Sequence, residues 1–341
     1  MEEGRVRLGI VGTGKLGTIH TRLAAGLTDA ELVGVYDVDR EKASELARAH
    51  RVRPFDSLEE LIGEVDGCVI VTPTSTHLDV ARQALAAGVD CFIEKPVAGS
   101  IAEAEELLRI ASGTNRIVQV GHVERFNPAF LAAENRPNPL FIEAHRLARF
   151  TPRATDVAVV FDLMIHDIDL VLTMLPGEDP VEIRASGVSI LSDEIDIANA
   201  RIEFPGGCVA NLTASRISRS PMRKMRVFGD RSYISWDFAE PSVEIFSVAS
   251  DPAHGGTSIP DVDPEVLRSM LGEIDAGTRE LAISYQRPPI PEINPIGREL
   301  ELFVESIRTR TPPPVTLEEG VRAVRLAEEI VSQILNRRTS V

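Results

Sequence analysis

The chain is poor in cysteine, and this shortage excludes two classes of protein. Its 341 residues include only Cys68, Cys91 and Cys208. These cysteines are odd in number and far apart, so they provide neither a disulfide framework nor the close spacing of a metal site. A reducing compartment suits such a chain, and we therefore expect a cytoplasmic protein without a bound metal.

Basic residues and long apolar runs are also scarce. The chain has 36 Lys and Arg against 52 Asp and Glu, which gives a net charge of −16. Binding to a polyanion needs a basic surface, so we expect no nucleic-acid partner. No apolar run approaches the ~20 residues that span a bilayer, and no basic, apolar signal peptide is seen, so we expect no membrane association. Any anionic substrate must then meet a local group of arginines or lysines.

The first third of the chain alternates short apolar runs with helical patterns. Strand–helix alternation at this spacing predicts a doubly wound parallel sheet of the Rossmann type. The expected strands are residues 5–11, 31–36, 67–71, 90–93 and 117–120, and the expected helices are 16–25, 41–49, 77–87 and 101–112.

The pattern changes after Gly121, where apolar runs follow one another with turns between them. Strands in series predict an antiparallel or mixed sheet, here an open-faced α+β domain. We place a dinucleotide-binding domain at 1–122 and a substrate-binding and oligomerisation domain at 123–341. The expected strands are 141–149, 181–189, 199–204, 208–215, 225–228 and 232–236, and the expected helices are 161–175, 297–308 and 317–336.

A G-x-G-x-x-G motif follows the first expected strand. In a dinucleotide-binding unit its glycines permit a tight turn, a close approach to the pyrophosphate and close packing of helix on strand. The pyrophosphate sits at the helix N-terminus, where free N–H groups and the helix dipole favour anions. The residues expected to bind the cofactor here are Gly12, Thr13, Gly14, Lys15, Leu16 and Gly17.

An acidic residue, Asp37, closes the second expected strand 20 residues after Gly17. A carboxylate at this place binds the ribose hydroxyls of NAD and repels the 2′-phosphate of NADP, so the pattern favours NAD over NADP. Arg40 is the exception, since it could reach such a phosphate or stack on the adenine. A turn that binds nothing is the alternative, but the strand context and Asp37 argue against it.

The tripeptide Glu94-Lys95-Pro96 lies at the carboxyl end of the strand expected over 90–93. Ligands of open α/β sheets bind at that edge. A lysine there can donate to a substrate oxygen and stabilise a developing alkoxide. A surface salt bridge is the alternative for the tripeptide taken alone.

A second group with possible chemistry is Asp162, His166 and Asp169, which fall on one stripe of the helix expected over 161–175. A histidine oriented by a carboxylate is a common general base near neutral pH. The alternatives are a satisfied histidine on a polar helix face and a metal site. The metal site lacks third and fourth ligands nearby in the sequence.

These motifs, in order with Thr72-Pro73-Thr74 and His77, resemble the glucose–fructose oxidoreductase, inositol dehydrogenase and rhizopine-catabolism (Gfo/Idh/MocA) family over essentially the whole chain. The resemblance implies a Rossmann domain and an open-faced mixed sheet. It also implies hydride transfer between NAD(P) and a sugar or cyclitol hydroxyl. Assembly through the second sheet, as a homodimer or homotetramer, is a further implication.

The resemblance also implies roles for single residues. Lys95 would bind the reacting hydroxyl, His166 would be the acid/base, and Asp162 would hold His166 or the substrate. One departure from the family is the stretch 157–160, which is Val-Ala-Val-Val where members often carry a glycine pair. The residues implied to line the cofactor are Thr72, Pro73, Thr74, His77, Glu94 and Lys95.

Segments 121–128, 141–147, 162–169 and 211–216 are similar to the branch that includes UDP-N-acetylglucosamine 3-dehydrogenases. Those enzymes oxidise the C3 hydroxyl so that an aminotransferase can install an amino group for lipid A. A diphosphate needs basic partners, and arginine binds it bidentately. The expected substrate-binding residues are Lys95, Arg125, Asn127, Arg146, Arg149, Asp162 and His166. A second basic cluster, Arg216, Arg219, Arg223, Lys224 and Arg226, could serve the phosphates or lie in solvent or at a subunit interface.

Two alternatives remain open from the sequence. One keeps the enzyme and changes the substrate to an inositol or a free sugar. The other is a non-catalytic regulator that senses NAD, as some members of this fold do. The presence of both Lys95 and His166 favours an enzyme, because a sensor needs no acid/base pair.

Overall fold

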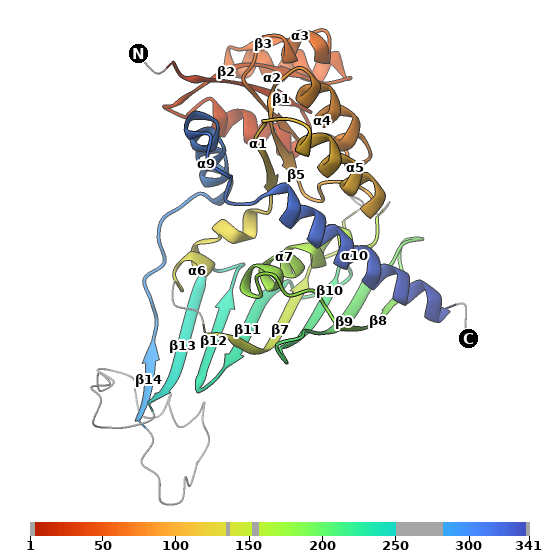
Figure 1. The fold of residues 1–341 in the computed structure, drawn as a ribbon, viewed down its shortest axis with the longest axis vertical. Coiled ribbons are helices and arrows are strands. Elements are labelled where there is room, and N and C mark those ends of the chain that lie inside the picture. Colours follow the sequence, from red (N-terminus) through yellow and green to blue (C-terminus); the bar gives the residue numbers. More distant parts are fainter. Residues whose placement is uncertain (1–3, 134–136, 152–156, 250–281, 339–341) are drawn as a thin grey trace, which may run out of the picture.

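A computed structural model describes residues 4–133, 137–151, 157–249 and 282–338. Two sheets are arranged one above the other, and the last two helices, α9 and α10, lie between or beside them (Figure 1). Each sheet corresponds to one of the two sequence patterns, the strand–helix alternation and the strands in series.

The first sheet has six strands in the order β3-β2-β1-β4-β5-β6, and all of its pairings are parallel. This confirms the predicted doubly wound Rossmann sheet. Its strands are β1 (Val6–Val11), β2 (Ala30–Tyr36), β3 (Arg53–Pro54), β4 (Gly67–Ile70), β5 (Asp90–Glu94) and β6 (Val118–Gly121). Its helices are α1 (Lys15–Ala24), α2 (Arg40–His50), α3 (Leu58–Ile62), α4 (His77–Ala86) and α5 (Ile101–Ser112).

The second sheet has eight strands in the order β14-β13-β12-β11-β7-β10-β9-β8. The pairing of β7 with β10 is parallel and the others are antiparallel, which confirms the predicted mixed sheet. Strands β13 and β14 extend it beyond the prediction. The strands are β7 (Pro139–Leu147), β8 (Glu182–Val188), β9 (Ile197–Glu203), β10 (Val209–Ser215), β11 (Met222–Gly229), β12 (Ser232–Asp237), β13 (Ser242–Ala249) and β14 (Ala282–Gln286).

The second sheet buries one face. Along β7, Ile142, Ala144 and Arg146 are buried, and the residues between them are partly exposed, as the two-residue period of a strand requires. Helices α6 (Pro128–Leu131), α7 (Ile165–Met174) and α10 (Leu317–Arg338) cover that face (Figure 1). No helix in the described ranges covers the opposite face, as expected for an open-faced sheet.

The helix expected over 161–175 begins differently. Its first turn, Val160–Met164, is π-helical, and α7 follows it at Ile165. A π-turn places residues five apart on successive turns, so Asp162 and His166 do not have the spacing of an α-helix. The prediction of one α-helical stripe through these residues was wrong at this turn. Such turns are frequent at functional sites.

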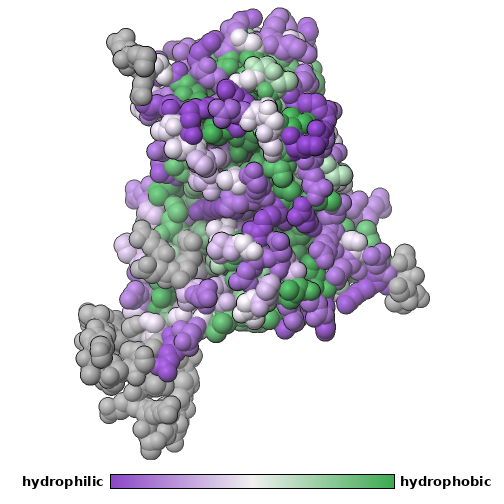
Figure 2. Space-filling model, in the orientation of Figure 1, coloured by the Kyte–Doolittle hydropathy of each residue, from purple (hydrophilic) through white to green (hydrophobic). Residues whose placement is uncertain are grey.

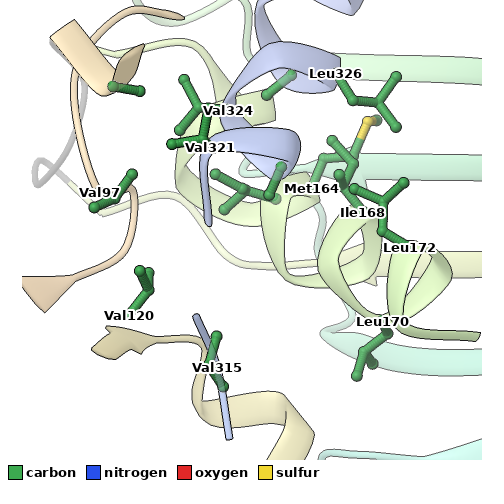
Figure 3. Packing of buried hydrophobic residues seen from close by; sticks show 14 of the residues in the cluster. Val97, Val120, Met164, Ile168, Leu170, Leu172, Val315, Val321, Val324 and Leu326 are labelled. Carbon is green, nitrogen blue, oxygen red and sulfur yellow. The ribbon is translucent and has the colours of Figure 1, made fainter. Parts of the chain in front are cut away.

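The chain returns to the first sheet after the second one. Leu300 and Phe303 of α9 (Pro295–Thr309) pack with Leu8 and Ile10 of β1 in one buried cluster. A second cluster joins the two sheets through α10, and Figure 3 shows Val97 and Val120 of the first unit near residues of this C-terminal segment. This continuous packing fixes the first sheet relative to the second.

The surface is mixed in character. Figure 2 shows hydrophilic side chains over much of one face, with smaller hydrophobic areas between them. Among the helices in the described ranges, none is long and apolar enough to cross a bilayer.

Candidate active site

The glycine-rich loop between β1 and α1 forms one wall of a cavity. Gly12 has a φ of +103°, and a Cβ there would lie 2.9 Å from the carbonyl of Val71. A Cβ at Gly17 would overlap the carbonyl oxygen of Gly12, so α1 packs this closely only with glycine. A Cβ at Gly14 would meet open space, so the backbone there faces the cavity. The amides at the start of α1 therefore remain available to an anion, as the motif predicts.

The cavity has a volume of about 690 Å³, which is the size of a small-molecule or cofactor site. It lies at the carboxyl ends of β1, β2 and β4, where open parallel sheets bind ligands. Leu16 and Val38, which are 40% and 88% exposed, present apolar surface on its wall. Its lining includes the predicted Gly12, Gly14, Lys15, Leu16, Asp37, Thr72 and Pro73, and also Tyr36, Val38, Lys42, Leu58, Thr76 and Gln83.

Asp37 is fixed at the mouth of this cavity by three donors. Its Oδ2 accepts from the backbone N of Thr13 at 2.6 Å and from the hydroxyl of Thr13 at 2.8 Å. Its Oδ1 accepts from the backbone N of Asp39 at 2.9 Å. A carboxylate can accept about four hydrogen bonds, so Asp37 can still accept hydrogen bonds from ribose hydroxyls. Thr13 thus acts on the site by holding Asp37.

Seven of the predicted cofactor residues do not line the cavity, namely Thr13, Gly17, Arg40, Thr74, His77, Glu94 and Lys95. The guanidinium of Arg40 is directed toward Asp56, 3.6 Å away, and Lys42 lines the wall instead. Thr74 lies in the short turn Thr74–Thr76, of which Thr76 lines the wall. Lys42 and Thr76 could not be found from the sequence, since neither belongs to the glycine motif.

His77 and Glu94 are placed behind the wall. Buried His77 has its Nε2 2.9 Å from the carbonyl oxygen of Thr72 and its Nδ1 3.1 Å from that of Pro96. It therefore connects the cofactor wall to the loop that carries Lys95. Burial lowers the pKa of His77, against the opposing effect of these two carbonyl contacts. Glu94 is buried and lies 2.8 Å from the Nε2 of His20.

Lys95 and Asp162 meet between the two sheets. The amine of Lys95 donates to the carbonyl oxygen of Asp162 at 2.6 Å and lies 4.0 Å from its carboxylate. Burial lowers the pKa of Lys95, against the opposing effect of the carboxylates of Asp162 and Glu94. The structure thus brings together two residues that are 67 positions apart.

His166 lies beside this pair in a strongly positive environment. Burial is the largest cause that lowers its pKa well below 6.5, and Lys95, Arg146 and Arg223 act in the same direction. Its Nδ1 is buried and has no hydrogen-bond partner among the described residues. The side chains of His166 and Asp162, both within the described residues, form no hydrogen bond with each other. A neutral imidazole can accept a proton at neutral pH.

Three predicted substrate residues are committed to internal contacts. Arg125 donates to Asp169 and Glu319, and Arg146 donates to Asp167 and Glu124. Both guanidiniums are at most 9% exposed; burial acts to lower their pKa values, but their ion pairs outweigh it and raise them above the ordinary value. Asn127 contacts Glu124 and Phe238 and caps α6. These side chains connect α7, β7 and the turn 123–126.

The second basic cluster divides between the two faces of β11. Side chains two residues apart on a strand share a face, so Arg223 lies on the same covered face as the buried Met225 and Val227. It lies at the end of β11 that is near His166. Lys224 and Arg226 are on the open face, where they pair with Asp237 and Glu143. Arg223 is 54% exposed along its side chain and lies 4.0 Å from Glu124.

The other arginines of this region lie at the strand ends. Arg149 is exposed and donates to the carbonyl oxygen of Arg219 at 3.2 Å. Arg216 is buried and donates to the carbonyl oxygen of Val157 at 2.6 Å. Arg219 is exposed at the same place, so Arg149, Arg219 and Arg223 are the exposed arginines at this end of β7, β10 and β11.

Comparison with known protein families identifies the family to which this chain belongs. Residues 6–122 match the Gfo/Idh/MocA family described as "Oxidoreductase family, NAD-binding Rossmann fold", and residues 149–341 match its C-terminal alpha/beta domain. The chain belongs to this family. The match confirms the predicted family, the NAD cofactor and an oxidoreductase rather than a sensor.

Individual relatives agree with this assignment. A UDP-N-acetylglucosamine 3-dehydrogenase of Acidithiobacillus ferrooxidans is 40% identical over 290 residues, which cover 83% of this chain and 90% of the relative. A solved structure of that enzyme has a TM-score of 0.84 at 34% identity and covers 97% of both chains. An inositol 2-dehydrogenase of Rhizobium meliloti is 26% identical and covers 98% of both chains.

Proposed function

We propose that this oxidoreductase oxidises a secondary hydroxyl of a sugar, and that the hydroxyl is C3 of UDP-N-acetylglucosamine. The observation that carries the proposal is the meeting of Lys95, Asp162 and His166 beside the cofactor wall, to which His77 connects the Lys95 loop. The 40% identical relative supports the choice of substrate. The product would be a 3-keto sugar, a substrate for amination on the way to lipid A or a surface polysaccharide. Such an enzyme needs NAD and a nucleotide sugar, and both are supplied in the cytoplasm, which is the location we propose.

The chain's own residues supply binding and proton transfer. His166 is neutral and accepts the hydroxyl proton at Nε2, because its Nδ1 is buried. Lys95, positioned by the carbonyl of Asp162, donates to the same oxygen and stabilises the negative charge that develops there. The carboxylate of Asp162 lies close enough to orient Lys95 or a neighbouring hydroxyl. The cavity beside the glycine-rich loop would hold NAD⁺, which would supply the hydride acceptor.

The diphosphate of the substrate requires cations whose guanidiniums are exposed rather than buried in internal ion pairs. Arg223 and Arg149 meet this need, because both are exposed near His166 or at the adjacent strand ends. Arg125 and Arg146, which the sequence favoured for this role, instead build the frame that holds α7. The local positive field offsets the net charge of −16.

The open face of the second sheet supports a proposal about assembly. An aromatic row, Phe141, Phe228, Tyr233, Phe246 and Tyr285, crosses five neighbouring strands. Ring centroids in this row are 4.7 to 5.9 Å apart. Partly exposed aromatics are typical of interfaces between subunits, so we propose a homodimer or homotetramer formed through this face.

A substrate panel tests the proposed activity. The purified chain is incubated with NAD⁺ and, separately, UDP-N-acetylglucosamine, other nucleotide sugars, inositols and free hexoses, while NADH absorbance is followed. We expect NADH with UDP-N-acetylglucosamine and a product that is two hydrogens lighter, with its carbonyl at C3. Oxidation of an inositol but of no nucleotide sugar would show that the chain is an inositol dehydrogenase, like the 26% identical relative. Absence of NADH with every compound would overturn the catalytic proposal.

A further inference from the structure

A buried histidine of the cofactor helix, His20, lies behind the proposed site. It is on α1, one turn beyond Gly17, and it is fully buried. Its Nε2 lies 2.8 Å from Oε1 of Glu94. Within the described ranges its Nδ1 has no hydrogen-bond partner, so the ring bonds to this carboxylate alone. Burial of a polar ring is unfavourable unless it forms hydrogen bonds, and the contact with Glu94 is therefore the one that holds His20 in place.

The surrounding residues leave room for this pair. Phe92 and Glu94 are two residues apart on β5, so their side chains point to the same side of the sheet. The ring centroid of Phe92 lies 5.5 Å from that of His20. Gly121 is the partner of Glu94 on β6, and a Cβ at Gly121 would lie 3.2 Å from the carboxyl carbon of Glu94. A glycine at this position therefore leaves space for the carboxylate that His20 contacts.

Glu94 is ionised although it is buried. Burial acts to raise the pKa of Glu94, but the hydrogen bond and the electrostatic effect of His20, followed by the effects of Lys95 and His77, outweigh it. The pKa of Glu94 consequently lies below its ordinary value of 4.5. An ionised carboxylate can only accept hydrogen bonds, so Nε2 of His20 carries the proton of this bond. The hydrogen bond is thus donated by α1 to the end of β5.

The same carboxylate contacts Lys95. Its other oxygen, Oε2, accepts from the backbone N of Lys95 at 3.3 Å, and the amine of Lys95 donates to the carbonyl oxygen of Asp162. Burial is the largest effect on the pKa of Lys95 and lowers it, and Arg146 acts in the same direction. The carboxylates of Asp162, Glu94 and Glu124 raise it. The carboxylate that His20 holds therefore helps to keep the amine of Lys95 charged.

We propose that His20 is a positioning residue for the oxidation. It holds the carboxylate of Glu94, and that carboxylate fixes the backbone of Lys95 so that the amine is directed at the reacting oxygen. His20 does not itself line the cofactor cavity. The contact makes one unit of the helix whose first turn receives the pyrophosphate and the lysine that stabilises the alkoxide. The inference rests on the proposed role of Lys95 in sugar oxidation.

Three variants of His20 test this contact. His20→Leu removes the donor and should lower kcat on the order of 10- to 100-fold, the range for one hydrogen bond to a charged group. The KM for the sugar and the dissociation constant of NAD should change little, and the latter shows that α1 is still in place. The amide nitrogen of glutamine is as many bonds from Cα as Nε2 of histidine, so His20→Gln should restore most of kcat. The amide nitrogen of asparagine matches the unbonded Nδ1, so His20→Asn should behave like His20→Leu.

Variants of Glu94 show whether His20 acts through this carboxylate. In a Glu94→Met background, His20→Leu should change kcat by less than about 2-fold, because the acceptor is already gone. Glu94→Gln should move the alkaline limb of the kcat profile to lower pH, since the charge of Glu94 raises the pKa of Lys95. Full activity of His20→Leu, or an equal loss of kcat with and without Glu94, would overturn the inference.

NMR of lysines labelled with carbon-13 at Cε gives a readout that does not depend on turnover, and Lys95→Met identifies the signal of Lys95. This signal should move in His20→Leu and His20→Asn and keep its position in His20→Gln. A signal at the same position in the wild type and all three variants would overturn the inference. If the wild type produces no NADH with any sugar but the signal responds as expected, only the proposed function fails.

Discussion

The amine of Lys95 donates a hydrogen bond of 2.6 Å to the carbonyl oxygen of Asp162. This contact joins the end of β5 in the first sheet to the π-helical turn that precedes α7 in the second unit. It therefore places a cation of the cofactor-binding domain beside the histidine of the other domain. The proposed chemistry depends on both domains at this one contact.

Removal of either proposed proton-handling side chain should abolish most turnover. We expect Lys95→Met and His166→Ala each to reduce kcat by ~10²–10⁴-fold, the range for a lost general acid or base. NAD affinity, measured by titration of cofactor fluorescence, should change little, because neither side chain lines the cavity of the glycine-rich loop. Near-normal kcat in both variants would contradict the assignment of these roles.

The pH dependence of kcat should be bell-shaped and displaced toward acid. His166 must be neutral to accept a proton, and its pKa lies well below 6.5, so activity should persist at pH 6.5 and fall only at lower pH. Lys95 must be charged to stabilise the developing alkoxide, and its pKa is lowered from 10.5, so the alkaline limb should lie below that value.

Arg223 provides a specific test of both the pH profile and the phosphate contact. Arg223→Gln removes a cation that lowers the pKa of His166, so the acid limb should move to higher pH. Its KM for UDP-N-acetylglucosamine should rise about 10-fold or more, the cost of a lost charged hydrogen bond. Arg226→Gln, on the open face, is the matched control and should change neither value. An unchanged KM in Arg223→Gln would place the diphosphate elsewhere.

Asp37 should control the choice between NAD and NADP. Asp37→Asn keeps the shape that receives Thr13 but removes the charge. We expect NAD to bind about 10-fold more weakly and the preference over NADP to shrink, because the repulsion of a 2′-phosphate is lost. Dissociation constants for both cofactors measure the change. Arg40→Gln is the control, since the guanidinium of Arg40 is directed toward Asp56; a large effect there would reverse the assignment.

Arg125 is expected to stabilise the fold rather than to bind the substrate. Arg125→Met leaves Asp169, which is 1% exposed, without its closest charged partner, and such a loss costs about 3–5 kcal/mol of unfolding free energy. Denaturant titration measures it. The exposed pair of Arg226 and Glu143 offers a control, for which Arg226→Met should cost about 0–1 kcal/mol. If Arg125→Met left the stability unchanged and raised the KM for the substrate, Arg125 would be a substrate-binding residue, as the sequence predicted.

The aromatic row should determine the oligomeric state. Phe228, which is 38% exposed and lies between Phe141 and Tyr233 in the row, is expected to lie in the subunit contact, so Phe228→Glu should reduce the assembly to smaller species. Light scattering coupled to size-exclusion chromatography measures the mass. Leu335→Glu, an exposed site on α10, should leave it unchanged. A monomeric wild type would exclude assembly through this face.

Local patterns were sufficient for much of the architecture. The strand–helix alternation, the glycine motif and Asp37 all lie within short stretches, whose geometry is determined by backbone sterics and hydrophobic period. The loop around Gly12 and Gly17 has the close contacts that the motif predicts. The helix over 161–175 was predicted in extent but not in its π-helical first turn, since that turn depends on packing against neighbouring elements.

The sequence by itself determined which cofactor domain this chain would build and which residue types could carry the chemistry. Only the tertiary structure decided which arginines are available. Arg125, Arg146 and Arg223 look alike in sequence, but two are neutralised by carboxylates of α7 and of the turn 123–126, and the third stays half-exposed. The return of α9 with Glu299 to the first sheet was likewise invisible, because pairing over such separations is set by long-range packing and charge balance rather than by local pattern.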